Sequence, residues 1–173
     1  MTEMTNRHKN ERSKAGNFMF NLLAKAVMPL IKHRWLYWLL NCTWGSLTTL
    51  CGCIISLVML CIGKKPHKWN SVWYFRIGKS WGGLEMGTMF LTEEEHYISI
   101  NNHELGHTFQ NAVLGPFYIL IVGLPSAIRY WARIFQQRKG KKLNDYDTMW
   151  FEGSATSIGT YIYENFSKKE EEE

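Results

Sequence analysis

The sequence predicts an α-rich α+β fold with a small β-sheet or hairpin, preceded by one transmembrane helix. Three observations support this prediction. Positions 35–62 form an apolar run without a charged residue, two short stretches of strand-like composition lie between positions 86 and 100, and apolar residues at helical spacing fill much of the remaining chain. With 173 residues, 46% of them apolar, the chain is long enough for one domain with an appended segment.

Charge is distributed unevenly along the chain. Residues 1–79 carry 12 Lys and Arg against 2 Asp and Glu, whereas residues 80–173 carry 8 against 13. A basic half around an apolar run favours contact with membrane lipid and argues against nucleic acid, because the aromatic residues do not interleave with a basic stripe. All four cysteines lie inside the apolar run, where we expect them to act as small packing residues.

Residues 1–34 are expected to form a basic N-terminal tail and an amphipathic helix. Apolar residues keep helical spacing from Phe18 to Leu30, and Lys25 and Lys32 lie off that face. Two interpretations remain open. The segment is either a solvated tail with a short surface helix or a helix that lies on a membrane surface.

Residues 35–62 are expected to form the transmembrane helix, because the 28 uncharged positions exceed the roughly 20 that suffice to span a bilayer. Basic residues bracket the run, and aromatic residues suited to the headgroup level follow its start: Lys32, Arg34, Lys64, Lys65, Trp35, Tyr37 and Trp38. A buried core helix is the alternative, but the run is long for so small a domain. Five Lys and Arg follow the run within 20 positions and three precede it, which favours a single-pass protein with a cytoplasmic C-terminal domain.

Residues 63–166 are expected to form the main domain, and residues 167–173 a charged tail. The runs 86–91 and 96–100 have strand composition and are separated by an acidic stretch at 92–95. The second run leads into a helix expected over 99–114, with Asn101 or Asn102 as its cap. The edge of that strand would let an extended peptide pair with it.

The stretch Val113–Ile128 is apolar but is interrupted by glycine and proline at four positions. It is too short and too interrupted for a second span, so it is either buried or dips into the membrane beside the first helix. From Ser126 we expect a helix with an apolar side and an arginine side. Both an interfacial helix and an ordinary surface helix fit this pattern.

The main functional signal is the pentad His103-Glu104-Leu105-Gly106-His107, which has the pattern H-E-x-x-H. On a helix, His103 and His107 lie one turn apart on the same face. Two imidazoles so placed can each give one nitrogen to a Zn²⁺ ion, while Glu104 is free to contact a metal-bound water as general base. The alternative is a polar helix face whose histidines are surface residues or satisfied core residues.

Glu152 is the expected third ligand. It precedes a row of small residues that would let its helix approach another helix closely, and the pentad contains a small residue as well: Gly153, Ser154, Ala155, Thr156, Gly159 and Gly106. Three protein ligands would leave the fourth zinc position for water. The rival carboxylates are Asp145, Asp147 and Glu164.

These blocks carry a family resemblance. The pentad followed by a helical glutamate resembles the gluzincin class of zinc metallopeptidases. More narrowly, H-E-L-G-H-T-x-Q, L-G-P-x-Y from Leu114, G-L-P-S from Gly123 and Glu152-x-x-Ala155 resemble small, uncharacterised, membrane-associated bacterial zinc metallopeptidases, over roughly residues 80–160. The resemblance implies a zincin-like helical metal site in a protein of the bacterial inner membrane.

The sequence departs from the gluzincin pattern at one position. Gluzincins commonly place an aspartate four residues after the ligand glutamate, where it orients a ligand histidine, but this sequence has Thr156 there. Asp145, Asp147 or a backbone carbonyl would then have to orient the histidine.

The expected function is that of a membrane-anchored zinc-dependent metallopeptidase acting on a peptide or protein substrate. Zinc would lower the pKa of its bound water, Glu104 would take the proton, and Tyr146, Tyr161 or His96 would stabilise the oxyanion. Two alternatives are a non-catalytic membrane protein with a structural zinc site and an intramembrane protease. The carboxylates at 93–95 argue against the latter, because they are costly in hydrocarbon. The sequence leaves the oligomeric state open.

Overall fold

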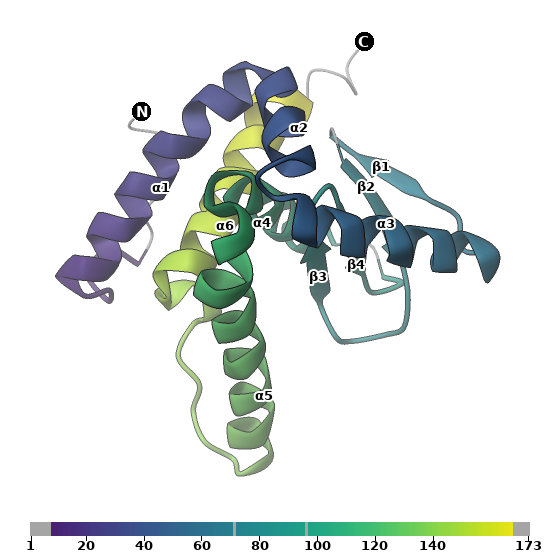
Figure 1. The fold of residues 1–173 in the computed structure, drawn as a ribbon. Helices are drawn as coiled ribbons and strands as arrows, with labels where there is room; N and C mark the ends of the chain where they lie inside the picture. The colour runs from purple at the N-terminus through teal and green to yellow at the C-terminus, as the bar shows by residue number, and fades with distance from the viewer. Residues whose placement is uncertain (1–7, 71, 96, 168–173) are drawn as a thin grey trace.

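The structure, a computed structural model, describes residues 8–70, 72–95 and 97–167. Its helices are α1 (Lys14–Lys32), α2 (Arg34–Cys42), α3 (Ser46–Cys61), α4 (Ile98–Leu114), α5 (Leu124–Arg138) and α6 (Trp150–Ile162), with short η1 (Gly115–Phe117), η2 (Ile119–Gly123), η3 (Tyr146–Thr148) and η4 (Tyr163–Ser167). Its strands are β1 (His67–Trp69), β2 (Val72–Arg76), β3 (Gly83–Met86) and β4 (Met89–Thr92). The predicted α-rich α+β class is confirmed (Figure 1). His96 and residues 168–173 of the expected tail lie outside the described residues.

The centre of the molecule is the pair α4 and α6, with α1 and α2 beside it and the sheet on the far side of α4 (Figure 1). One buried apolar cluster joins these helices to the sheet; its members include Tyr37, Leu105, Phe109, Ile158, Phe90, Tyr74, Leu30 and Ile31. Each such side chain contributes roughly 1.5–3 kcal/mol by leaving water. The N-terminal segment expected at 1–34 therefore packs, through α1, onto the same core as the main domain.

Two glycines bring α4 and α6 unusually close together. A Cβ atom at Gly106 would lie 1.9 Å from the carbonyl oxygen of Ala155, and one at Gly159 would lie 1.6 Å from that of Asn102. Neither helix can carry a larger residue at these points without moving away. The small residues that predicted a close approach are thus the ones at the crossing, and they set the rotation of α6 about α4.

The continuous helix expected over 35–62 is not formed. The segment is divided into α2 and α3, which meet at an angle of 87°. Two buried hydrogen bonds stabilise the break between α2 and α3: Asn111 of α4 donates to Asn41 (2.7 Å) and accepts from Thr48 (2.6 Å). Gly45 leaves room for the Asn111 side chain, because a Cβ there would lie 2.7 Å from the Asn111 amide nitrogen. The run has no charged residue, but it contains uncharged polar residues in its middle, and their hydrogen bonds favour the break.

No described helix is by itself both long and apolar enough to cross a membrane. Two bent pairs have the length and composition when each pair is taken together. They are α2 with α3, and the segments Ile98–Phe117 and Ile119–Arg138, which meet at 114°.

The sheet has the strand order β1-β2-β4-β3, with β2 and β4 parallel and the other pairs antiparallel. The strand expected at 86–91 is split between β3 and β4, which meet at a turn where Gly87 has a φ of 74°. The strand expected at 96–100 is wrong, because the chain leaves the sheet after β4 and Ile98 begins α4. Asn101 and Asn102 are buried inside α4, and its N-cap is Tyr97. The sheet edge near α4 is therefore β3.

The stretch Val113–Ile128 contains the end of α4, η1, η2 and the start of α5. Gly115, with a φ of 56°, allows the chain to turn there, and a Cβ at this position would overlap the Trp44 ring. After the turn, α5 projects from the body of the molecule, and a loop returns beside it to α6 (Figure 1).

Candidate metal centre

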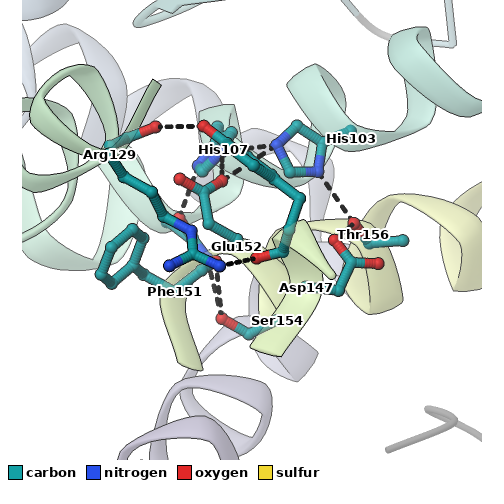
Figure 2. Close-up of polar contacts among 11 residues, drawn as sticks. His103, His107, Arg129, Asp147, Phe151, Glu152, Ser154 and Thr156 are labelled. Carbon is teal, nitrogen blue, oxygen red and sulfur yellow. Dashed lines mark hydrogen bonds and ion pairs between the residues drawn. The ribbon is translucent and has the colours of Figure 1, made fainter. Parts of the chain in front are cut away.

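Two side chains of α4 and one from the first turn of α6 converge on one point (Figure 2). His103 Nε2 lies 3.0 Å from His107 Nε2, and Glu152 Oε2 lies 3.1 Å from the former and 3.2 Å from the latter. Glu152 and His107 are buried and His103 is half-buried. No other His, Cys, Asp or Glu joins this group in the part of the chain that the structure describes.

The tautomer of His107 is set by Gln110. The Gln110 amide nitrogen donates to the Phe151 carbonyl (2.7 Å) and to Ser154 Oγ (2.9 Å), so its oxygen must face His107 Nδ1 at 2.8 Å and accept from it. With its proton on Nδ1, a neutral His107 directs the lone pair of Nε2 toward Glu152. Gln110 thus orients one candidate ligand and ties α4 to α6.

The tautomer of His103 is set by Thr156 and Asp147. Thr156 Oγ1 donates to Asp147 Oδ1 (3.0 Å), and since it has one proton it must accept from His103 Nδ1 (2.8 Å). Figure 2 shows this chain on the far side of the His103 ring from Glu152. Of the groups expected to compensate for Thr156, the structure brings Asp147 into place, with Thr156 itself as the link.

These contacts test whether the group suits a cation. Two nitrogens without protons face each other at 3.0 Å and share a carboxylate oxygen, so a positive charge is required among them. Without a metal, protons on the imidazoles would supply this charge: hydrogen bonding and positive charge from His103 and His107 then outweigh burial, which alone would raise the pKa of the Glu152 carboxyl, and hold that pKa well below its usual range. The other Glu152 oxygen is buried without a partner. A metal ion would satisfy all three side chains, and tetrahedral zinc ligands lie about 3.3 Å apart.

Glu104 lies on α4 outside the group of three convergent side chains, and its side chain lies against β3. Gly83 makes room for it, since a Cβ at Gly83 would lie 2.6 Å from Glu104 Cγ. Burial raises the pKa of the Glu104 carboxyl to about 7; His107 and the backbone N–H of Glu85 oppose the rise, and Glu152 adds to it. A carboxylate with a pKa near neutral pH is suited to accept a proton.

No protein-family model matches this chain, and no curated protein or solved structure matches it either. The resemblance to gluzincins therefore rests on the sequence blocks.

Of the three residues expected to stabilise the oxyanion, Tyr146 lies at the site. Its ring centre is 6.0 Å from that of His103, and its hydroxyl is hydrogen bonded with Ser126 Oγ at 3.2 Å. Burial and the nearby Glu152 carboxylate raise the pKa of the Tyr146 hydroxyl, so it stays protonated and able to donate.

Two other expected participants lie elsewhere. Tyr161 is about 13 Å further along α6 than Glu152 by helix geometry, and it packs against the main core cluster. The Asp145 side chain is 76% exposed and lies 3.9 Å from His8. The expected donor His96 is outside the described residues.

Three residues near the site had no role in the sequence prediction: Gln110, Tyr118 and Glu85. The ring centre of Tyr118 is 6.4 Å from that of His107, and Glu85 of β3 is hydrogen bonded to Tyr118. Gln110 and Tyr118 belong to the quoted blocks H-E-L-G-H-T-x-Q and L-G-P-x-Y, which was the available signal. Glu85 had none, because its burial depends on how β3 packs against α4.

Replacing Thr156 with Val should weaken metal binding roughly 10- to 100-fold, the usual effect of losing an outer partner of a ligand histidine. Val has nearly the same shape but cannot link His103 to Asp147. Competition with a chromogenic chelator measures the affinity. Thr156→Ser should restore binding and Thr160→Val, one turn along α6, should leave it unchanged; equal affinity in Thr156→Val and the wild type would contradict the role.

Glu85 gives the metal-free protein a specific pH dependence. Burial raises the pKa of its carboxyl well above the usual value; hydrogen bonds from Tyr118 and Gly87 lower it, and Glu104 raises it. Because the folded pKa is raised, the stabilising contribution is complete below the unfolded pKa of 4.5 and is lost as pH rises through the folded pKa. As pH rises, the free energy of unfolding of Glu85→Gln should therefore increase relative to that of the wild type. Urea titrations from about pH 4.5 to pH 8 measure this difference, and a constant difference would refute it.

Proposed function

We propose that this protein is a zinc-dependent metallopeptidase with His103, His107 and Glu152 as the zinc ligands. The observation that carries the proposal is the pair of Nε2 lone pairs, each fixed by a hydrogen bond at Nδ1, that converge on the Glu152 carboxylate. Two neutral imidazoles and one carboxylate are the donor set of catalytic zinc in several metallopeptidases. Two imidazole nitrogens and one carboxylate oxygen suit zinc better than metals that prefer soft sulfur ligands or all-oxygen ligand sets.

The remaining residues divide the chemistry of peptide hydrolysis among them. Bound zinc supplies a water of lowered pKa and polarises the scissile carbonyl. The Glu104 carboxylate accepts the proton of the attacking water and then donates it to the leaving amine. The Tyr146 hydroxyl, held by Ser126, donates a hydrogen bond to the oxygen on which negative charge develops. Thr156, Asp147 and Gln110 keep the two imidazoles oriented.

The edge strand β3 suggests how a substrate is held. Gly83 of β3 lies against Glu104, and β3 is an outer strand of the sheet. An extended peptide that pairs with β3 would pass the Glu104 carboxylate. This assigns to β3 the role that the sequence prediction gave to residues 96–100.

A structural zinc site is the alternative, and the number of ligands argues against it. Structural zinc sites are closed by four protein ligands, whereas catalytic sites keep one position for water. Among the described residues the group contains three metal-ligating side chains, with a buried carboxylate base next to them.

Metal analysis combined with a cleavage assay tests the proposal. The purified full chain should contain one zinc per molecule and should hydrolyse members of a quenched fluorescent peptide library. A chelator should stop hydrolysis, and added zinc should restore it. Stoichiometric zinc with no cleavage of any library member would favour the structural alternative, and absence of zinc binding would refute both.

A further inference from the structure

Helix α3 buries small residues, two of them polar, and exposes most of its large apolar residues. Its buried residues are Thr48, Thr49 and Gly52, while Leu50 and Leu57 are more than 60% exposed. The same outer side also carries Leu47, Ile54 and Val58, each at least half exposed. A helix of a water-soluble surface normally shows the reverse pattern. The outer side of α3 therefore requires an apolar neighbour.

Helix α5 buries none of its residues yet carries a continuous apolar stripe. The stripe begins in η2 and repeats at helical spacing: Leu120, Leu124, Ile128, Trp131 and Phe135, each more than half exposed. The other side of the helix is attached to the returning loop, because Arg129 donates to the Asp145 carbonyl (3.0 Å) and Arg133 donates to that of Asn144. The apolar stripe has no such attachment among the described residues.

The two apolar sides join at the base of both helices. Trp44, just before α3, donates from its ring N–H to the Val113 carbonyl (3.2 Å) and lies against Phe117 of η1, with ring centres 6.1 Å apart. Both rings are about half exposed. The outer side of α3, Trp44, Phe117 and the stripe from Leu120 to Phe135 thus form one surface, which we call the apolar V. Figure 1 shows its two arms projecting in different directions.

Charge identifies what the apolar V contacts. Residues 44–70 and 114–144, which contain both arms and their tips, carry nine Lys and Arg and no Asp or Glu. The rest of the chain carries 11 Lys and Arg against 15 Asp and Glu. Seven of the nine cations lie at or beyond the C-terminal ends of α3 and α5: Lys64, Lys65, Lys68, Arg138, Lys139, Lys141 and Lys142. Apolar faces with basic ends suit an anionic lipid surface, whereas a second copy would place like charges together.

The lengths of α3 and α5, the two arms of the apolar V, indicate how they lie in the bilayer. With 16 and 15 residues, α3 and α5 are about 24 Å and 22 Å long, shorter than the hydrocarbon core of about 30 Å. We propose that the apolar V lies within one leaflet of an anionic bilayer, with acyl chains against its apolar side chains and headgroup phosphates against the basic tips. The protein is then attached to one side of the membrane in place of the single-pass arrangement expected from the sequence. This proposal does not depend on the zinc site.

Binding to vesicles tests the proposal. The full chain, diluted from detergent, should float with phosphatidylcholine–phosphatidylglycerol vesicles and at least tenfold less with pure phosphatidylcholine vesicles. The triple variant Ile128→Ser, Trp131→Ser, Phe135→Ser should reduce flotation at least tenfold while circular dichroism is unchanged, because these side chains are not buried. The double variant Leu50→Ser, Leu57→Ser on α3 should act in the same direction.

A matched control uses exposed apolar residues outside the apolar V. Phe18 and Leu22 of α1 are exposed to a similar degree. Phe18→Ser, Leu22→Ser should leave flotation unchanged, and a loss equal to that of the α5 variant would overturn the assignment to the apolar V. Trypsin added outside the vesicles should cleave near both Lys65 and Lys141. Protection of one tip alone would overturn the one-leaflet arrangement, as would a wild-type chain that stays in solution as a stable oligomer.

Discussion

Glu104→Gln should reduce peptide hydrolysis about 10²- to 10⁴-fold, the contribution usual for a general acid–base residue. Gln keeps the size of the side chain beside Gly83 but cannot accept the proton of the attacking water. Zinc should remain bound at one ion per chain, because Glu104 does not belong to the ligand group formed by His103, His107 and Glu152.

The measurement is kcat/KM on the best substrate of the peptide library, together with metal analysis of the same sample. Glu164→Gln, an exposed glutamate of η4, serves as the matched control and should retain full activity. Wild-type activity in Glu104→Gln would exclude this residue as the base. Loss of zinc together with activity would instead show that Glu104 supports the metal.

Glu152→Ala should weaken zinc binding more than 100-fold, beyond the range expected when an outer partner of a ligand is lost. The change removes the one carboxylate of the ligand group and leaves two neutral imidazoles, so no ligand offsets any of the divalent charge. Glu152→Gln keeps the volume of the buried side chain and should show nearly the same loss. If both variants unfold no more readily than the wild type, the effect lies in the ligand and not in the fold.

Asp145→Asn is the matched control for this prediction. Asp145 was a rival ligand in the sequence, but its side chain is largely exposed. Its replacement should leave zinc affinity unchanged. Stoichiometric zinc in Glu152→Ala, or loss of zinc in Asp145→Asn, would point to a different ligand set.

The parts of the site that could be predicted are those fixed by local spacing. The pentad places His103 and His107 on one face of any helix, and the small residues around Gly106 and Gly159 indicated a close helix pair. Glu152 followed from that pair as the carboxylate at its start. The link from His103 through Thr156 to Asp147 could not be predicted, because it depends on how η3 folds back over the first turns of α6.

The errors have a common physical cause. The run 35–62 was predicted to be one helix because it lacks charge, but hydrogen bonds from Asn111, far along the chain, stabilise a break at Gly45. The residues 96–100 have strand composition, yet Ile98 begins α4 because the buried pair α4 and α6 outweighs local preference. In both cases a distant partner decided the local conformation.

The crossing at Gly106 and Gly159 has a consequence for how such a protein can change over evolution. The close approach of α4 and α6 rests on these two glycines and not on the side chains of His103, His107 and Glu152. Lineages could therefore lose the ligands and keep the fold, giving inactive relatives that still present the same surfaces. Such relatives would retain the glycines at positions 106 and 159 and lack the histidines at positions 103 and 107.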